Sequence, residues 1–271
     1  MRYGPSFITS LRDNLSRGYK MVTKMRILKE FESKGKHVLI GLPGMGRVGY
    51  ASVNYILEKV DGDLVAELYS TTFPSQLMVS KRGLSTLFVG RLYDAGDFLM
   101  FTSDTQPQSS EGQHELCMEL LDHLVSKGRP ESIVAAAAYV VPEFSDSRKV
   151  FIAGNDEELI QRLSRLGGSV LEDGVITGVN GVVVGWASYY DVKSVVALGE
   201  TWSAIVEFNE VDYRAVKSVV DLLRNYLGLR LNTEDLIAQA ELVESRIQAA
   251  ITQVSKLMGR GAERRESREI M

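Results

Sequence analysis

The residues whose types and spacing most suggest chemistry lie in a glycine-rich run from Gly41 to Gly49. Three of its glycines have the spacing of a dinucleotide-binding turn, Gly44-x-Gly46-x-x-Gly49, and Glu67 could serve as the downstream acid of that fingerprint. The free N–H groups of a helix that follows such a turn would also form an anion site. The alternatives are a structural tight turn and a loop that binds a partner.

The same run lacks groups that hold phosphate firmly. Gly41 to Gly46 has phosphate-loop spacing, but Arg47-Val48 stands where lysine followed by serine or threonine is required. Arg47 is the only obvious basic residue at this loop. A bound nucleotide is therefore the less favoured interpretation.

Polar residues at strand ends and a second glycine-rich run, Gly174 to Gly181, extend this candidate site. Asp104 and Gln106 end one predicted strand, and Glu200 ends another. Ligands of open α/β sheets gather at the carboxyl ends of strands, although side-chain hydrogen bonds in tight turns explain the same residues. The residues expected to form a ligand or partner loop are Gly41, Gly44, Gly46, Arg47, Gly49, Asp104, Gln106, Thr177, Gly178, Asn180, Gly181 and Glu200.

A helix predicted from about 109 to 127 carries Glu111, His114 and Cys117 at a spacing that could place three metal ligands on one face. No second ligand pair accompanies them, so we expect a half-buried helix face and no metal. Cys117 lies among apolar residues, which does not favour a nucleophile, and the sequence contains no Gly-x-Ser-x-Gly elbow. We therefore expect no catalytic residues and no cofactor.

The composition is that of a globular protein. The chain has 271 residues, of which 45% are hydrophobic and 24% charged. A net charge of −4 gives no reason to expect nucleic acid as a partner, and no apolar run is long enough to cross a bilayer. Cys117 is the only cysteine, which excludes an intramolecular disulfide framework and suits a reducing compartment. We expect a cytoplasmic protein.

Alternating strand and helix patterns predict an α/β core over residues 24–210. The apolar run 133–141 predicts a central parallel strand. A basic arm over residues 1–23 precedes the core, a helical region follows over 211–258, and a charged, disordered tail covers 259–271. Strands are predicted at 24–31, 38–42, 64–69, 77–79, 85–93, 97–102, 133–141, 150–153 and 192–198, and helices at 48–60, 109–127 and 156–166.

The last predicted helix, from Asn232 or Thr233 to Met258, has apolar residues spaced alternately four and three apart. Such a seam is typical of a coiled coil or a helical hairpin. Packing on the preceding helix and association between copies of the chain explain it equally well. The seam residues are Leu236, Ala240, Val243, Ile247, Ala250, Val254 and Leu257.

The sequence resembles the proteasome assembly chaperone family in its archaeal and bacterial branch. The resemblance covers roughly residues 24 to 202 and implies a three-layer α/β/α fold, similar to nucleoside phosphorylases, with a mainly parallel sheet and a helical C-terminal part. The matching pieces occur in the family's order: Gly41 to Gly49, Phe73-Pro74, Ser103 to Pro107, Ile176 to Gly181 and Gly199 to Thr201.

The resemblance also implies a function. Such proteins are non-enzymatic oligomers that help proteasome α subunits to assemble or bind the α ring. Some relatives dock through a C-terminal hydrophobic–tyrosine–any-residue motif, whereas this sequence ends Glu269-Ile270-Met271. We therefore expect a homo-oligomeric scaffold or chaperone with a protein partner. The alternative is a phosphate-, nucleoside- or nucleotide-binding enzyme or sensor that uses the glycine-rich loops.

Overall fold

The computed structural model describes residues 22–269, with side chains described as far as residue 255. Residues 1–21 of the expected basic arm, and Ile270-Met271 at the other end, lie outside the described residues. The helical elements are η1 (Met45–Arg47), α2 (Val48–Lys59), α3 (Ser110–Ser126), α4 (Glu157–Arg165), α5 (Val179–Tyr189), α6 (Ser203–Glu207), α7 (Tyr213–Leu227) and α8 (Asp235–Glu269).

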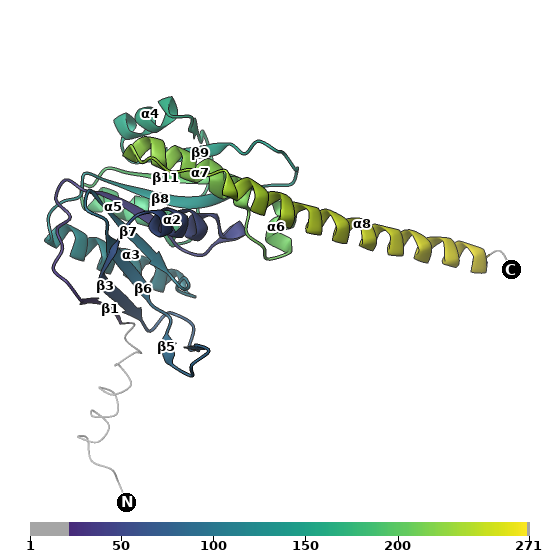
Figure 1. The fold of residues 1–271 in the computed structure, drawn as a ribbon, viewed down its shortest axis with the longest axis horizontal. Helices are drawn as coiled ribbons and strands as arrows, with labels where there is room; N and C mark the ends of the chain where they lie inside the picture. The colour runs from purple at the N-terminus through teal and green to yellow at the C-terminus, as the bar shows by residue number, and fades with distance from the viewer. Residues whose placement is uncertain (1–21, 270–271) are drawn as a thin grey trace, which may run out of the picture.

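Within the described residues, one mixed sheet of nine strands forms the centre of the molecule, in the order β1-β3-β6-β7-β2-β8-β11-β9-β10 (Figure 1). The pairs at its centre, β7-β2, β2-β8 and β8-β11, are parallel, and antiparallel pairs flank them. The strands of this sheet are β1 (Thr23–Ile27), β2 (His37–Gly41), β3 (Asp63–Ser70), β6 (Gly90–Asp94), β7 (Phe98–Ser103), β8 (Ser132–Val141), β9 (Val150–Gly154), β10 (Ser169–Val170) and β11 (Ser194–Trp202).

Helices cover both faces of the sheet, which confirms the predicted α/β fold. Successive residues of β2 face opposite ways, so that Ile40 packs in a core with α3 and α5, whereas Leu39 packs in a second core with α2, α4 and α7. The predicted central strand at 133–141 is β8, which is parallel to both of its neighbours. Its apolar run follows from this burial on two faces.

The outer edge of β1 is closed by acidic side chains. The N–H groups of Thr23 and Met25 donate to Glu115 and Glu119 of α3, in both cases over 2.9 Å. Strand edges with free N–H groups tend to pair with other chains. These two carboxylates therefore keep β1 from recruiting a further strand.

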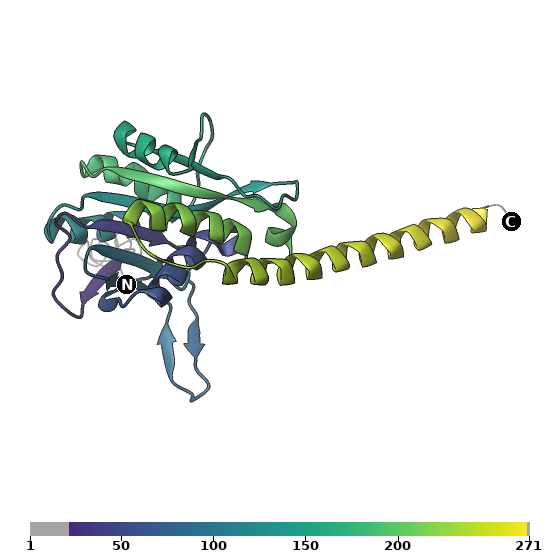
Figure 2. The ribbon, with the colours of Figure 1, turned by 45° about the horizontal axis from the view of Figure 1, so that its top comes forward.

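A separate hairpin of β4 (Leu77–Val79) and β5 (Ser85–Leu87) projects from the body (Figure 2). The run 85–93, predicted as one strand, is thus divided between β5 in the hairpin and β6 in the main sheet. The two halves pair with different partners, β4 and β3, which sequence periodicity does not reveal.

Helix α8 is longer than predicted. It runs to Glu269, whereas the sequence predicted an end near Met258 and a disordered tail from Gly259. The residues after Gly261 are mostly Arg and Glu, which favour helix, and no proline interrupts them. The first part of α8 packs on α7 as a helical hairpin, and the remainder extends away from the body (Figures 1 and 2).

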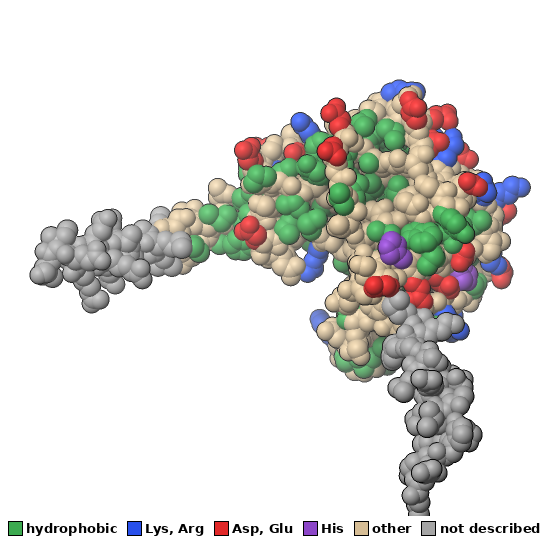
Figure 3. Space-filling view, turned by 180° about the vertical axis from the view of Figure 1, so that it is seen from behind, with side chains coloured by type: hydrophobic (Ala, Val, Ile, Leu, Met, Phe, Trp, Pro, Cys, Tyr) green, Lys and Arg blue, Asp and Glu red, His purple; other side chains and the backbone are tan. Residues whose placement is uncertain are grey.

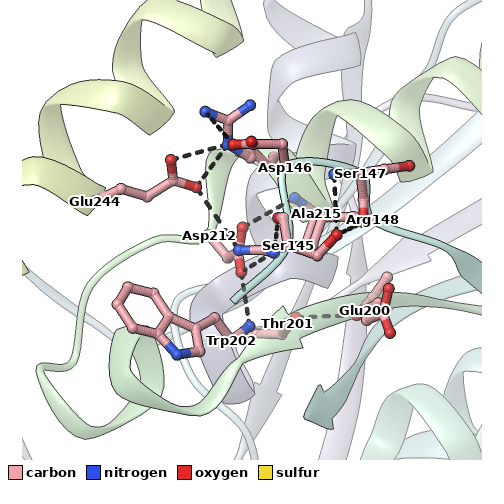
Figure 4. Close-up of polar contacts among 12 residues, drawn as sticks. Ser145, Asp146, Ser147, Arg148, Glu200, Thr201, Trp202, Asp212, Ala215 and Glu244 are labelled. Atoms are coloured by element: carbon pink, nitrogen blue, oxygen red, sulfur yellow. Dashed lines mark hydrogen bonds and ion pairs between the residues drawn. The ribbon is translucent and has the colours of Figure 1, made fainter. Parts of the chain in front are cut away.

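A buried cluster of charges holds this hairpin on the core (Figure 4). The side chains of Arg148 and Asp212 are completely buried, and Arg148 Nε lies 3.5 Å from Asp212 Oδ2. Arg148 Nη2 also lies 3.7 Å from Oε1 of Glu244 in α8, and Arg214 Nε donates to both oxygens of Glu244 over 2.8 and 2.9 Å. Three segments distant in sequence are thereby joined: the loop before β9, the start of α7, and α8.

Asp212 is the centre of this cluster. Its Oδ1 accepts the N–H of Ala215 and caps α7, and its Oδ2 accepts the N–H of Trp202 at the end of β11, both over 3.0 Å. Its own N–H donates to the carbonyl of Gly46 in η1 over 3.0 Å. The glycine-rich loop and the helical hairpin are therefore fixed by the same residue.

Burial raises the pKa of Glu244 above its ordinary value, while Arg214 and Arg148 oppose the shift. The folded chain thus binds this proton more tightly than the unfolded chain does. The resulting contribution to stability is fully present below the ordinary pKa of the carboxyl. It is lost as the pH rises through the raised pKa.

We expect Arg148→Met to lower the free energy of unfolding by about 3–5 kcal/mol, because two buried carboxylates lose a cation. The loss should be smaller at pH 5 than at pH 8, since the buried Glu244 carboxyl, whose pKa is raised, is protonated more at the lower pH and then carries less uncompensated charge. Urea denaturation at both pH values measures it. As a matched control, Arg26→Met removes an exposed partner of Glu67, 3.8 Å away, and should cost less than about 1 kcal/mol. Equal losses in the two variants would contradict the central role of Arg148.

Candidate functional site

The two glycine-rich runs meet at the carboxyl ends of β2, β8 and β11 and border a cavity of about 610 Å³, here called the strand-end groove. Six of the predicted site residues line it: Gly44, Gly49, Gln106, Thr177, Gly178 and Asn180. The remaining lining residues are Met45, Ser110, Gln113, Ala137, Ala138, Tyr139, Val140, Leu171, Asp173, Gly174, Val175, Ile176 and Leu198.

Two amide side chains hold the glycine-rich runs together. Asn180 accepts the N–H of Leu42 at Oδ1 and donates to the carbonyl of Leu42 from Nδ2, both over 3.0 Å. Gln106 donates from Nε2 to the carbonyl of Pro43 and accepts the N–H of Val179 at Oε1 over 2.9 Å. Both amides thus bond to the main chain of the loops that they connect.

Most glycines of the first run are required by close packing. A Cβ atom on Gly41 would lie 2.1 Å from the carbonyl oxygen of Gly49, and one on Gly49 would lie 2.1 Å from that of Ala136. Gly46 has φ +54°, and its Cβ would lie 2.6 Å from Thr201. These contacts let the start of α2 approach β2 and β8, so the dinucleotide-like spacing has a structural explanation.

The second run repeats this packing. A Cβ on Gly181 would lie 2.4 Å from Ile176, and Gly178 adopts φ +81° where α5 begins. Gly44 differs, because its backbone is extended and it faces open space except for Gln106. Gly44 is therefore a glycine of the first run that packing does not require.

Six predicted site residues do not line the strand-end groove: the three closely packed glycines Gly41, Gly46 and Gly181, and the charged residues Arg47, Asp104 and Glu200. Asp104 pairs with Arg91 over 2.7 Å and accepts the N–H of Val89. Glu200 accepts the N–H of Lys149 over 3.0 Å, next to the buried charge cluster (Figure 4). Arg47 is exposed, with φ +50°, just before α2. The side chains of Asp104 and Glu200 hold strand ends in place.

The chemistry of the strand-end groove does not favour phosphate. Among the described residues that line it, Asp173 is the one charged side chain, and it is an acid. A phosphate or nucleotide site needs cations or several converging N–H groups. The walls are instead apolar side chains and neutral amides, which suit contact with a peptide or another uncharged group.

The predicted metal and nucleophile candidates lie elsewhere. Cys117 is buried between the sheet and α3, and burial raises the pKa of its thiol to about 12. His114 accepts the indole N–H of Trp186 at Nδ1 over 2.9 Å. In the part of the chain that the structure describes, no three metal-ligating side chains come together.

The heptad seam is divided by the structure. The seam residues Leu236, Ala240, Val243 and Ile247 are buried. Leu236 lies in the core under α7, whereas Val243 and Ile247 pack beside Trp202 and Ile205. Val254, by contrast, is 54% exposed. The side chain of Leu257 lies outside the described residues. The first half of the seam is therefore intramolecular packing, and Val254 belongs to the part of α8 that leaves the body.

The sequence prediction missed the far end of β8. Ala138, Tyr139 and Val140 line the strand-end groove, although only the strand itself was predicted. A hint was present in the lengths of the apolar runs, because 133–141 is longer than its partner 38–42. A strand that outlasts its neighbour leaves part of its edge unpaired.

Fold and site together define an α/β protein with an apolar groove at its strand ends and a long C-terminal helix that leaves the body. The chain belongs to the PAC2 family, whose model matches residues 38–251. This confirms the resemblance to proteasome assembly chaperones. Within residues 22–269, no helix combines the length and the apolar character that crossing a membrane requires.

Relatives match along most of the chain. PbaB of Pyrococcus furiosus, an archaeal proteasome activator, has 25% identity and a TM-score of 0.75, covering 84% of this chain and 98% of PbaB. PbaA of the same organism, an archaeal homolog of proteasome-assembly chaperone, has 26% identity and a TM-score of 0.71, covering 90% and 98%. The uncharacterized protein MJ1210 of Methanocaldococcus jannaschii is 24% identical over 234 residues, which are 84% of this chain and 88% of MJ1210.

We expect Gly49→Ala to lower the free energy of unfolding by about 1–3 kcal/mol or more, because its Cβ overlaps the carbonyl of Ala136. Gly185→Ala is the matched control. Gly185 lies in α5 with no atom within 4 Å of an added Cβ, so this change should stabilise the protein by about 0.5–1 kcal/mol. Thermal and urea unfolding of both variants measure the difference. A Gly49→Ala protein as stable as the native chain would show that the close approach is not required.

Proposed function

We propose that this protein is a non-enzymatic, homo-oligomeric scaffold or chaperone that binds proteasome α subunits. The observation that carries the proposal is the match to PbaA and PbaB over 98% of each of those chains. One is described as a proteasome activator and the other as a homolog of a proteasome-assembly chaperone. A function in protein binding also fits a groove with apolar walls and one acidic residue.

The projecting part of α8 supports the homo-oligomeric part of the proposal. Beyond Ile247, the described apolar side chains of Ile251 and Val254 are 37% and 54% exposed. Apolar side chains lie along the described part of α8 as it leaves the body (Figure 3). A helix that exposes apolar side chains is more stable when a partner covers them. We assign the seam residues Ala250, Val254 and Leu257 to contact with a second copy.

Native mass spectrometry of this protein, alone and mixed with proteasome α subunits from the same source, tests the partner. We expect a discrete mixed complex whose mass gives both stoichiometries. Proteasome β subunits from that source are the matched control and should not join the complex. A homo-oligomer that ignores the α subunits would refute the proposed partner.

Deletion of residues 252–271 tests the helical contact. We expect a lower oligomeric mass by light scattering, because Val254 and Leu257 are removed. The melting temperature should stay close to that of the native chain, since Leu236, Val243 and Ile247 keep their packing. An unchanged mass would count against the projecting helix as an interface.

A further inference from the structure

Strand β8 continues beyond its neighbour β2. The parallel pairing of β2 with β8 ends at Ile40 and Ala135, where the chain turns away at Gly41. On its other side, β8 remains paired with β11 in unbroken register as far as Val141 and Trp202. The last residues of β8 are therefore a sheet edge on one side only, in the middle of the sheet order.

The main-chain groups of Ala138 and Val140 point to this vacated side. The N–H of Ile133 donates to the carbonyl of Lys193, on the β11 side, over 2.9 Å. Because successive residues of a strand direct their N–H and C=O groups to opposite sides, even-numbered residues face the position that β2 has left. Within residues 22–269, neither Ala138 nor Val140 has a hydrogen bond on that side.

The vacated position opens into the strand-end groove, which both residues line. Tyr139 and Val175 stand at its surface with 39% and 91% exposure. The polar side chains Ser110 and Gln113 lie at its rim, with Asp173 as the one charged group among the described lining residues. Apolar walls beside free main-chain donors and acceptors are the requirements of an added β-strand.

The outer edge of the sheet at β1 is protected, in contrast to the end of β8. At β1 the outward N–H groups of Thr23 and Met25 are occupied by Glu115 and Glu119. The end of β8 has no such cover among the described residues. This contrast favours an edge that is kept for a partner.

We propose that an extended segment of the protein partner adds to β8 as a strand in the strand-end groove. Its main chain bonds to Ala138 and Val140, its alternate side chains are small and apolar, and a basic group on it faces Asp173. This inference rests on the proposed function, so the segment belongs to a proteasome α subunit. It assigns to the groove a peptide rather than a nucleotide.

A site-specific cross-link tests the location. Val175→Cys places an accessible thiol at the groove, because the native Cys117 is buried. Tyr189→Cys, 76% exposed on α5 and not among the groove residues, is the matched control. Each variant is labelled with benzophenone maleimide, mixed with proteasome α subunits and illuminated. Peptide mass spectrometry then identifies the joined segments.

We expect the Val175→Cys protein to cross-link to one extended α-subunit segment and the control to give at least tenfold less product. If native mass spectrometry shows a complex but position 175 gives no cross-link, the strand-end groove is not the binding site, while the proposed function still stands. No complex at all with α subunits would overturn both. Equal amounts of product from positions 175 and 189 would show that the α subunit contacts the surface without preference, which would also refute the groove as the binding site.

Val140→Pro tests the main-chain bond. It removes an N–H that faces the groove and leaves the bonds of β8 to β11 unchanged, so the melting temperature should change little. We expect at least tenfold weaker binding of α subunits. Val140→Thr, which keeps the N–H and the branched shape, should bind as the native chain does. If a folded Val140→Pro protein binds α subunits with native affinity, strand addition at β8 is wrong.

Discussion

The arrangement of this molecule depends on a carboxylate that is completely removed from water. Asp212 accepts the N–H of Trp202, the last residue of β11, and caps α7. Its own N–H donates to Gly46 of the glycine-rich loop, and Arg148 compensates its charge. An isolated charge at such a depth would be very costly, so its partners must all be present together. Glu244 brings α8 into the same cluster. The direction in which α8 leaves the body is thus linked to the folding of the loop beside the groove.

The second constraint is space. Gly41 and Gly49 allow the start of α2 to lie directly on β2 and β8, and Asn180 completes the hydrogen bonds of Leu42 that the turn leaves open. In many α/β enzymes a glycine turn at this position receives a ligand's phosphates. Here the glycines of the turn are in close contact with the neighbouring main chain instead. The edge that remains open is the main chain of β8, which is suited to recognising another main chain.

Much of the fold could be predicted from the sequence, because alternation and apolar runs report burial directly. The run 133–141 gave the central strand, and the heptad spacing gave the helix that begins at Asp235. The buried cluster could not be predicted, since Arg148, the neighbouring Asp212 and Arg214, and Glu244 come from three distant parts of the sequence and resemble ordinary surface charges.

The residues of the candidate site were predicted only in part, because the sequence does not show which way a side chain points. Gln106 and Asn180, two of the predicted site residues, line the strand-end groove, and the structure shows both engaged with main chain. Asp104 and Glu200 were placed in the same pocket because they end strands, but their carboxylates bond to the neighbouring β6 and to the residue before β9. A strand-end position does not fix the direction of a side chain. That depends on which cation or N–H group lies beside it.

The length of α8 has a geometric consequence. From Ile247, its last buried seam residue, to Glu269 the helix rises by about 33 Å. Whatever the far part of α8 contacts is therefore held well away from whatever occupies the groove. Two weak contacts separated by a stiff spacer reinforce each other only when both targets match that separation. In the oligomer proposed above, this stiff spacer would set the distance between the contact to the second copy and the partner segment in the strand-end groove.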